Sequence, residues 1–177
     1  MDTFTKQADG LAIRGLAREE WYVTGLGVGR VVVAGDFPLR LDLPDPAVAA
    51  APGRPSSRWP GLLERYFAGE RVAFDLDVDA FADSRGLTDF ERDVYRALAN
   101  VPYGTAVSYR ELATAAGRPQ AYRAAGSAMA RNVLPVILPC HRVVRNDGRL
   151  GQYGDDPAWK ARLLTLEGVP VVEGRLA

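Results

Sequence analysis

The chain has 177 residues, 47% apolar and 25% charged, with a formal net charge of zero, which is typical of a globular protein with one good core or two small ones. No apolar stretch approaches the roughly 20 residues of a membrane helix, and the N-terminus carries no basic-then-apolar signal, so we expect a cytoplasmic protein. The single cysteine and single histidine exclude an internal disulfide and fall short of the about four ligands of a zinc site, so we expect no metal.

The first half of the chain predicts a small α/β scaffold. An aromatic run at 21–23 and a β-branched run at 30–34 flank the glycine-rich stretch 24–29. Because a strand follows these glycines where a phosphate-binding loop requires a helix, we interpret the stretch as a hairpin turn. Further along, the pattern predicts a third strand at 39–43, a loop at 44–60, a helix at 61–68 and a strand with one apolar and one acidic face at 72–79.

A domain boundary is expected between residues 84 and 85, which divides the chain into a scaffold domain at 1–84 and a second domain at 85–177. In the second domain, Thr88 and Ser108 each stand three residues before a glutamate, a pattern that caps the start of a helix. They predict one helix to about residue 99 and a shorter one that ends at Gly117. After a break at 118–119, a third helix is predicted at about 120–131.

The second and third of these helices have the outline of a helix-turn-helix. Residues 110–149 hold seven arginines against two acids, so we expect this region to face a polyanion, although merely solvated arginines are the alternative. The third helix carries small residues such as Ala124, Ala125 and Gly126. Small side chains let a helix lie close to a nucleic-acid backbone, but close packing on the protein's own core explains them equally well.

The only cysteine and the only histidine are adjacent, at Cys140 and His141. The apolar run 133–138 predicts a buried strand that delivers Cys140 to a bend, since Pro139 interrupts strand pairing. A thiolate is the nucleophilic form of cysteine, and near neutral pH it requires a neighbouring base or a positive charge such as Arg142. The alternative is a small buried cysteine beside an ordinary histidine.

The last helix is marked by Asp156 as its cap, Pro157 in its first position and Gly168 after its end. Glu167 stands at its C-terminus, where the helix dipole disfavours an anion by roughly 0.3 to 1 kcal/mol. A local rule broken in this way points to function. We expect the Glu167 carboxylate to orient and polarise His141 in a Cys, His, Glu relay, with an ordinary exposed glutamate as the alternative.

Over about residues 88–168 the chain resembles the 6-O-alkylguanine-DNA alkyltransferases, also called methylated-DNA-protein-cysteine methyltransferases. The resemblance rests on Pro139-Cys140-His141-Arg142-Val143, with further matches at Tyr103-Gly104, Ser108-Tyr109, 123–126, Asn132, 151–154 and 160–168. It implies an α+β fold, in which a small α/β domain with a ribonuclease-H-like sheet and a helix precedes a mostly helical, winged-helix-like domain with the helix-turn-helix.

In this family a damaged guanine is rotated out of the duplex and its alkyl group is transferred irreversibly to the cysteine, so each protein molecule acts once. The resemblance therefore implies DNA repair by an alkyltransferase whose partner is double-stranded DNA containing 6-O-alkylguanine. It leaves activity on 4-O-alkylthymine open. It implies no cofactor, no membrane and no obligate protein partner, and we expect a monomer.

Carried over to this chain, Cys140 would accept the alkyl group, His141 would act as its base through a bridging water, and Glu167 would orient His141. Tyr109 would donate a proton or hydrogen bond to the leaving guanine, and Arg123 would fill the gap left in the base stack. The resemblance further implies DNA contacts by Tyr122, Ala124, Ala125, Gly126 and Arg118, and substrate contacts by Asn132, Met129, Val143, Tyr153, Gly154 and Lys160.

Three positions depart from the family pattern. Asp155-Asp156-Pro157 replaces a glycine-rich loop near the pocket mouth, which bears on the size of the alkyl groups accepted. Tyr122 stands where a small residue is usual, and we predict that it contacts DNA backbone or packs beside Arg123. Val133 replaces a proline after Asn132, the residue that resembles the family's hinge between the recognition helix and the active-site strand.

Two other functions stay open. A non-catalytic damaged-DNA sensor or helix-turn-helix regulator would use the same helices, but alkyltransferase-like proteins of that kind lack the acceptor cysteine that Cys140 provides. A cysteine hydrolase would ordinarily take its base from a remote part of the sequence, and this chain has no second histidine.

Overall fold

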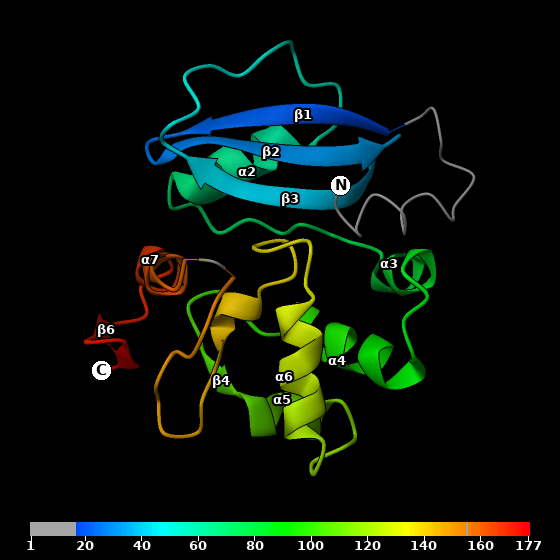
Figure 1. Cartoon of the computed structure of the whole chain (residues 1–177), viewed down its shortest axis with the longest axis vertical. Helices are drawn as coiled ribbons and strands as arrows, with labels where there is room; N and C mark the ends of the chain where they lie inside the picture. Colours follow the sequence, from blue (N-terminus) through cyan, green and yellow to red (C-terminus); the bar gives the residue numbers. More distant parts are fainter. Residues whose placement is uncertain (1–16, 155) are drawn as a thin grey trace. The chain divides into compact units, whose positions relative to one another are not determined.

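The computed structural model describes residues 17–154 and 156–177. Within them the chain is a mixture of helices and small sheets, and it divides into two compact units, one up to Asp75 and one from Leu76 onwards (Figure 1). The α/β character is confirmed. The domain boundary between residues 84 and 85, the ribonuclease-H-like sheet and the winged-helix-like arrangement stay predictions.

The first unit contains an antiparallel sheet in the order β1-β2-β3, with β1 at Ala17–Thr24, β2 at Gly27–Ala34 and β3 at Phe37–Asp45. The predicted hairpin and third strand are confirmed. Opposite Tyr22 on β1 lies Gly29 on β2, where a Cβ would stand 2.0 Å from the Tyr22 ring. One of the three glycines therefore makes room for a buried aromatic ring, whose hydroxyl donates a hydrogen bond to the Asp42 carbonyl at 2.8 Å.

Helix α2 (Trp59–Phe67) covers one face of this sheet, as Figure 1 shows. Its residues Trp59, Leu63 and Tyr66 are buried, and the ring of Phe67 stacks on that of Tyr22 with centroids 5.8 Å apart. These contacts give the first unit its apolar core, in which burial of each large side chain contributes about 1.5 to 3 kcal/mol.

The predicted strand at 72–79 is wrong. The chain runs there without regular structure as far as Asp77, which caps helix α3 (Val78–Ser84) by accepting a hydrogen bond from the Ala80 amide at 2.9 Å. The alternation itself is real, because Phe74 is buried between exposed neighbours. None of the sheets within the described residues includes this stretch, and alternating burial without a pairing strand does not make a β-strand.

The second unit contains the predicted helices, α4 at Asp89–Ala99, α5 at Tyr109–Ala115 and α6 at Tyr122–Ala130. Both capping boxes are present, at Thr88 and at Ser108. Helices α5 and α6 pack against each other and are joined by the turn 116–121. The sequence therefore located these helices to within one or two residues at each end.

The predicted buried strand at 133–138 is also wrong. The run is mostly buried, but it forms successive turns in which Val136 has a φ of 72°. The Asn132 side chain takes the place of a strand partner, since its amide donates to the Leu138 carbonyl at 2.8 Å and its carbonyl accepts from the Leu134 amide at 3.0 Å. A 3-10 turn at Cys140–Arg142 follows, and only then does the short strand β5 (Val143–Val144) pair in parallel with β4 (Val107–Ser108).

Helix α7 (Ala158–Leu166) begins one residue after Pro157, and the Asp156 carboxylate accepts a hydrogen bond from the Ala158 amide at 2.9 Å. Asp155 lies outside the described residues. The sequence did not predict the final hairpin of β6 (Val171–Val172) and β7 (Arg175–Leu176). This hairpin binds the loop after β5 through the hydrogen bonds Leu150 N to Gly174 O and Leu176 N to Gly148 O, both at 2.9 Å.

Candidate active site

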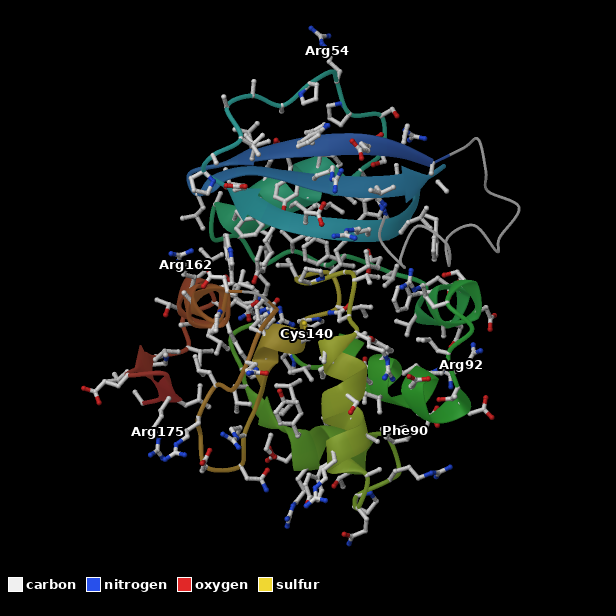
Figure 2. All side chains as sticks on the ribbon, viewed as in Figure 1. Arg54, Phe90, Arg92, Cys140, Arg162 and Arg175 are labelled. Atoms are coloured by element: carbon white, nitrogen blue, oxygen red, sulfur yellow. The ribbon has the colours of Figure 1, made fainter. Side chains whose placement is uncertain are left out.

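Cys140 lies on the 3-10 turn of the second unit (Figure 2). Its thiol is buried. The Asn132 amide nitrogen is 3.0 Å from its sulfur, and the Tyr153 hydroxyl is 3.8 Å from it. Burial raises the pKa of the Cys140 thiol, while the hydrogen bonds with Asn132 and Tyr153 and the charge of Lys160 oppose that rise. Because burial prevails, the resting group is a thiol and needs a base to become a nucleophile.

His141 and Glu167 form a buried pair, with His141 Nε2 2.7 Å from a carboxylate oxygen of Glu167. Burial lowers the pKa of His141 against the opposing effect of Glu167. Burial also disfavours the Glu167 carboxylate, but hydrogen bonds from His141 and Arg142 outweigh it and bring its pKa down to about 2. At neutral pH the pair is therefore a neutral imidazole that donates from Nε2 to a carboxylate, and such a ring accepts a proton at Nδ1.

Arg142 completes this cluster, which the sequence did not reveal. Its guanidinium donates to both oxygens of Glu167, each at 2.9 Å, and to the Val101 carbonyl at 2.6 Å. The sequence suggested only that Arg142 places a positive charge near the thiol. A signal for its true role exists, because a buried carboxylate at a helix C-terminus requires a cation, and Arg142 is beside the histidine that the carboxylate orients.

The turn at Tyr103-Gly104 supplies a further donor to Glu167. The Gly104 amide lies 3.1 Å from a carboxylate oxygen, and Gly104 has a φ of 75° with its would-be Cβ 3.1 Å from the Glu167 carbonyl. A residue with a side chain would be strained there, because the left-handed conformation and the close backbone both favour glycine. Glu167 is thus held by His141, Arg142 and Gly104, which offsets the cost of an anion at the end of α7.

Lys160 and Tyr109 are two further groups whose pKa values are affected by a Cys140 thiolate. The Lys160 side chain is buried, its ammonium is 5.7 Å from the centroid of the Tyr109 ring, and within the described residues it makes no ion pair. Burial lowers the pKa of Lys160 to about 8, against the opposing effect of a Cys140 thiolate. Burial and the same thiolate raise the pKa of Tyr109, so its hydroxyl stays protonated and able to donate a hydrogen bond.

The remaining predicted substrate residues have different surroundings. Met129 and Val143 are buried, Tyr153 is half-buried next to the thiol, and Gly154 is exposed. Asn132 is closer to the chemistry than its predicted role as a hinge suggests, because its amide contacts the Cys140 sulfur directly.

The predicted DNA residues of α6 separate into two groups. Ala125 is completely buried, and Gly126 faces the Tyr109 ring, since a Cβ there would lie 3.7 Å from it. The small side chain of Ala125 therefore packs within the unit, and its contact with DNA stays a prediction that this burial does not support. Ala124 and Arg123 are exposed, and Tyr122 is half-buried at the start of the helix.

Arginines without an acidic partner gather on the helix-turn-helix. Within the described residues, no carboxylate forms an ion pair with Arg110 of α5, Arg118 of the turn or Arg123 of α6. All three are exposed. A cation without a partner attracts an external anion, so this surface has the electrostatic character of a phosphate-binding face.

No helix in the described parts of the chain is long and apolar enough to cross a membrane. The same residues contain no group of three or more His, Cys, Asp or Glu side chains arranged to hold a metal ion.

Comparison with known proteins gives a consistent result. Residues 89–169 match the family described as 6-O-methylguanine DNA methyltransferase, DNA binding domain. A methylated-DNA–protein-cysteine methyltransferase of Methanosarcina barkeri is 43% identical over 105 residues, which are 59% of this chain and 63% of that protein. The chain thus spans less than two thirds of the length of this relative.

Solved structures match over more of the chain. The crystal structure of Mycobacterium tuberculosis O6-methylguanine methyltransferase is 30% identical, with a TM-score of 0.66 over 89% of this chain and 96% of that one. A structure of the M. tuberculosis OGT in complex with DNA is 32% identical, with a TM-score of 0.64 over 85% of this chain and 92% of that one.

Proposed function

The chain belongs to the 6-O-methylguanine DNA methyltransferase family, and we propose that it repairs DNA by moving an alkyl group from 6-O-alkylguanine onto Cys140. The observation that carries this proposal is the buried thiol of Cys140 beside a His141 that Glu167 fixes in one tautomer. Such a pair supplies the base that a buried thiol needs.

The proposed transfer is a single displacement. His141 Nδ1 takes the thiol proton, directly or through water, while the sulfur attacks the alkyl carbon. The new carbon–sulfur bond forms as the bond between that carbon and guanine O6 breaks, and the electron pair stays with the guanine. The guanine then gains one proton, for which the Tyr109 hydroxyl is the proposed donor. The proton that His141 took from the thiol passes back to the Tyr109 oxygen, so both side chains end in their starting protonation states. The product is a thioether, whose carbon–sulfur bond is stable, and single turnover is therefore part of the proposal.

The surroundings of the thiol support this chemistry. A buried thiolate is poorly solvated, and the thiolate formed from a thiol of raised pKa is intrinsically more nucleophilic than one formed from a thiol of low pKa. Lys160 places a positive charge near the developing thiolate, and no acid within the described residues cancels that charge. Asn132 donates to the sulfur from 3.0 Å and thereby holds it in place for attack.

Because the thiol is buried, a base inside a duplex cannot reach it, and we infer that the target guanine leaves the helix before reaction. The exposed arginines of the helix-turn-helix support this, since they offer phosphate contacts with little sequence preference. Arg123 is the proposed residue that enters the vacated place in the stack. The complex of the similar M. tuberculosis protein with DNA supports DNA as the partner.

The finer assignments are part of the same proposal. Met129, Val143, Tyr153 and Lys160 line the base site, Arg118 contacts phosphate, and the loop that includes Asp156 and Pro157 limits the size of the alkyl group. We propose that the protein acts as a monomer in the cytoplasm without a cofactor.

One observation favours a second function. The raised pKa of Cys140 is also what an inert thiol would have, and a protein with such a thiol would bind damaged DNA as a sensor without repairing it. The two functions differ in whether the lesion disappears.

The test measures the loss of the alkylated base from the DNA. Protein in excess over a duplex with one 6-O-methylguanine should convert that base to guanine, as chromatography of the digested DNA would show, with one lesion removed for each molecule consumed. Cys140→Ser should bind the duplex and leave the lesion intact. Binding by the wild-type protein without loss of the lesion would favour the sensor, and loss of many lesions for each molecule would contradict single turnover.

A further inference from the structure

We propose that Tyr122 and Arg110 position the side chain of Arg123 for its entry into the base stack, with Tyr122 as the ring on which the guanidinium rests. This inference rests on the proposed function and adds two positioning residues to it. The first residue of α6 is Tyr122, an aromatic side chain directly before Arg123.

Two guanidinium groups approach the same ring. The central carbon of Arg123 lies 5.9 Å from the centroid of the Tyr122 ring, and that of Arg110 lies 5.7 Å from it. Arg110 comes from α5, which packs against α6. Both helices of the helix-turn-helix therefore contribute a cation to one aromatic side chain, at distances within the about 6 Å range of cation–π attraction.

No acid competes for these cations. The nearest carboxylate in sequence is that of Glu111, which accepts a hydrogen bond from the Ser108 amide at 2.6 Å and thereby caps α5. Arg110 and Arg123 form no ion pair within the described residues. Two like charges on one ring repel each other, so one of them gains by moving to an external anion while the ring retains the other.

The two arginines lie on different helices. Arg123 lies on α6, whereas Arg110 lies in the first turn of α5. We assign Arg110 to a DNA phosphate and Arg123 to the stack. When a phosphate draws Arg110 away, Tyr122 keeps the flat face of Arg123 oriented, which lowers the entropy lost when that side chain inserts between bases.

The ring, and not the hydroxyl, carries this role. Tyr122 is half-buried, so packing restricts the orientation of its ring. Within the described residues its hydroxyl makes no hydrogen bond. Tyr122→Phe keeps the ring and removes only the hydroxyl, which makes it the matched control for Tyr122→Ala.

The experiment separates base extrusion from chemistry. Single-turnover rates are measured with saturating duplex containing 6-O-methylguanine, and with the free base 6-O-benzylguanine, which reaches the thiol without extrusion. A cation–π contact at an exposed site corresponds to about a two- to fivefold effect. Tyr122→Ala should therefore lower the duplex rate by about two- to fivefold and leave the free-base rate as in the wild type, and Tyr122→Phe should restore the duplex rate.

Arg110→Ala tests the second assignment. It should weaken duplex binding and lower the slope of log affinity against log salt by about 1. Arg96→Ala, which removes an arginine paired with Asp79 at 2.7 Å, is its control and should leave that slope unchanged.

Several outcomes would overturn the inference. A duplex rate that is unchanged in Tyr122→Ala, or a rate that falls equally in Tyr122→Ala and Tyr122→Phe, excludes the ring as a positioning element. An equal fall on the duplex and on the free base indicates damage to the active site instead. A wild-type protein that reacts with neither substrate overturns the proposed function itself, which distinguishes that failure from a failure of this inference alone.

Discussion

Helix α4 and the helix-turn-helix carry the same residue type in opposite electrostatic states. On α4, Arg96 pairs with Asp79 at 2.7 Å and Arg92 with Asp83 at 2.5 Å. On α5, the following turn and α6, Arg110, Arg118 and Arg123 have no carboxylate partner within the described residues. Arginine content alone does not distinguish the two regions, because the neighbours decide whether a guanidinium is already neutralised or still attracts an anion.

Arg142 shows a third state of the same side chain. It is buried and bound to both oxygens of Glu167. A surface pair such as Arg96 with Asp79 contributes little to stability, whereas removal of one partner of a buried pair is strongly destabilising. The comparison therefore predicts that the three kinds of arginine differ in what their loss does: Arg142 and its partner affect folding, Arg118 affects DNA binding, and Arg96 affects neither to a large extent.

The largest effect is expected from Glu167→Ala. It leaves the Arg142 guanidinium buried without its carboxylate, and loss of one partner of a buried pair costs about 3 to 5 kcal/mol. Urea unfolding should show this decrease in the free energy of unfolding. Glu70→Ala, which removes the exposed partner of Arg65, is the control and should change stability by less than about 1 kcal/mol. Equal effects of the two substitutions would contradict the distinction between buried and exposed pairs.

Acid should remove the same contribution in the wild-type protein. The Glu167 carboxyl has a pKa of about 2 in the folded state against an ordinary value of 4.5. Because the folded pKa is lowered, this stabilisation is complete above pH 4.5 and is lost as the pH falls towards 2, by about 3 kcal/mol in total. Unfolding measured across this range should show a steeper loss in the wild type than in Glu167→Gln, and parallel curves would count against the assignment.

Asn132→Ala should have an intermediate effect. It removes the donor to the Cys140 sulfur and the bonds that shape the turns before it, and a buried group left unsatisfied costs about 1 to 3 kcal/mol. The thiolate also loses a stabilising hydrogen bond, so the pH at which iodoacetamide modifies Cys140 should rise. A variant with unchanged stability and unchanged pH dependence would show that Asn132 has neither role.

The smallest effect in free energy is expected from Arg118→Ala. Loss of one phosphate contact should lower the salt slope of duplex binding by about 1 and weaken binding to damaged and undamaged duplex alike. Stability should stay the same, since Arg118 makes no ion pair within the described residues. An unchanged salt slope would place Arg118 outside the DNA-binding surface.

Local signals explain which parts of this fold were predictable from the sequence. The capping boxes at Thr88 and Ser108 involve residues three apart, so a short window of sequence contains all the information. The strands predicted at 72–79 and 133–138 failed for the opposite reason. A strand requires a distant partner, and these runs have buried side chains without one.

The candidate site shows the same division. Cys140, His141 and Glu167 were identified from residue type and position, and His141 does contact Glu167. The sequence did not reveal the bond from Arg142 to Glu167, because it depends on the direction in which the 3-10 turn aims each side chain. The sequence assigned Ala125 to DNA, whereas the structure buries it. A small residue is compatible with either face of a helix, so the sequence pattern alone does not distinguish a buried position from an exposed one.

The most direct test of the central claim is the intact mass of the protein after brief incubation with a duplex that carries one 6-O-methylguanine. We expect a gain of one CH2 on each reacted molecule, located at Cys140 by peptide mapping and absent from Cys140→Ser. An unchanged mass for wild-type protein that binds the duplex would contradict the claim that the buried Cys140, with His141 and Glu167, accepts the alkyl group.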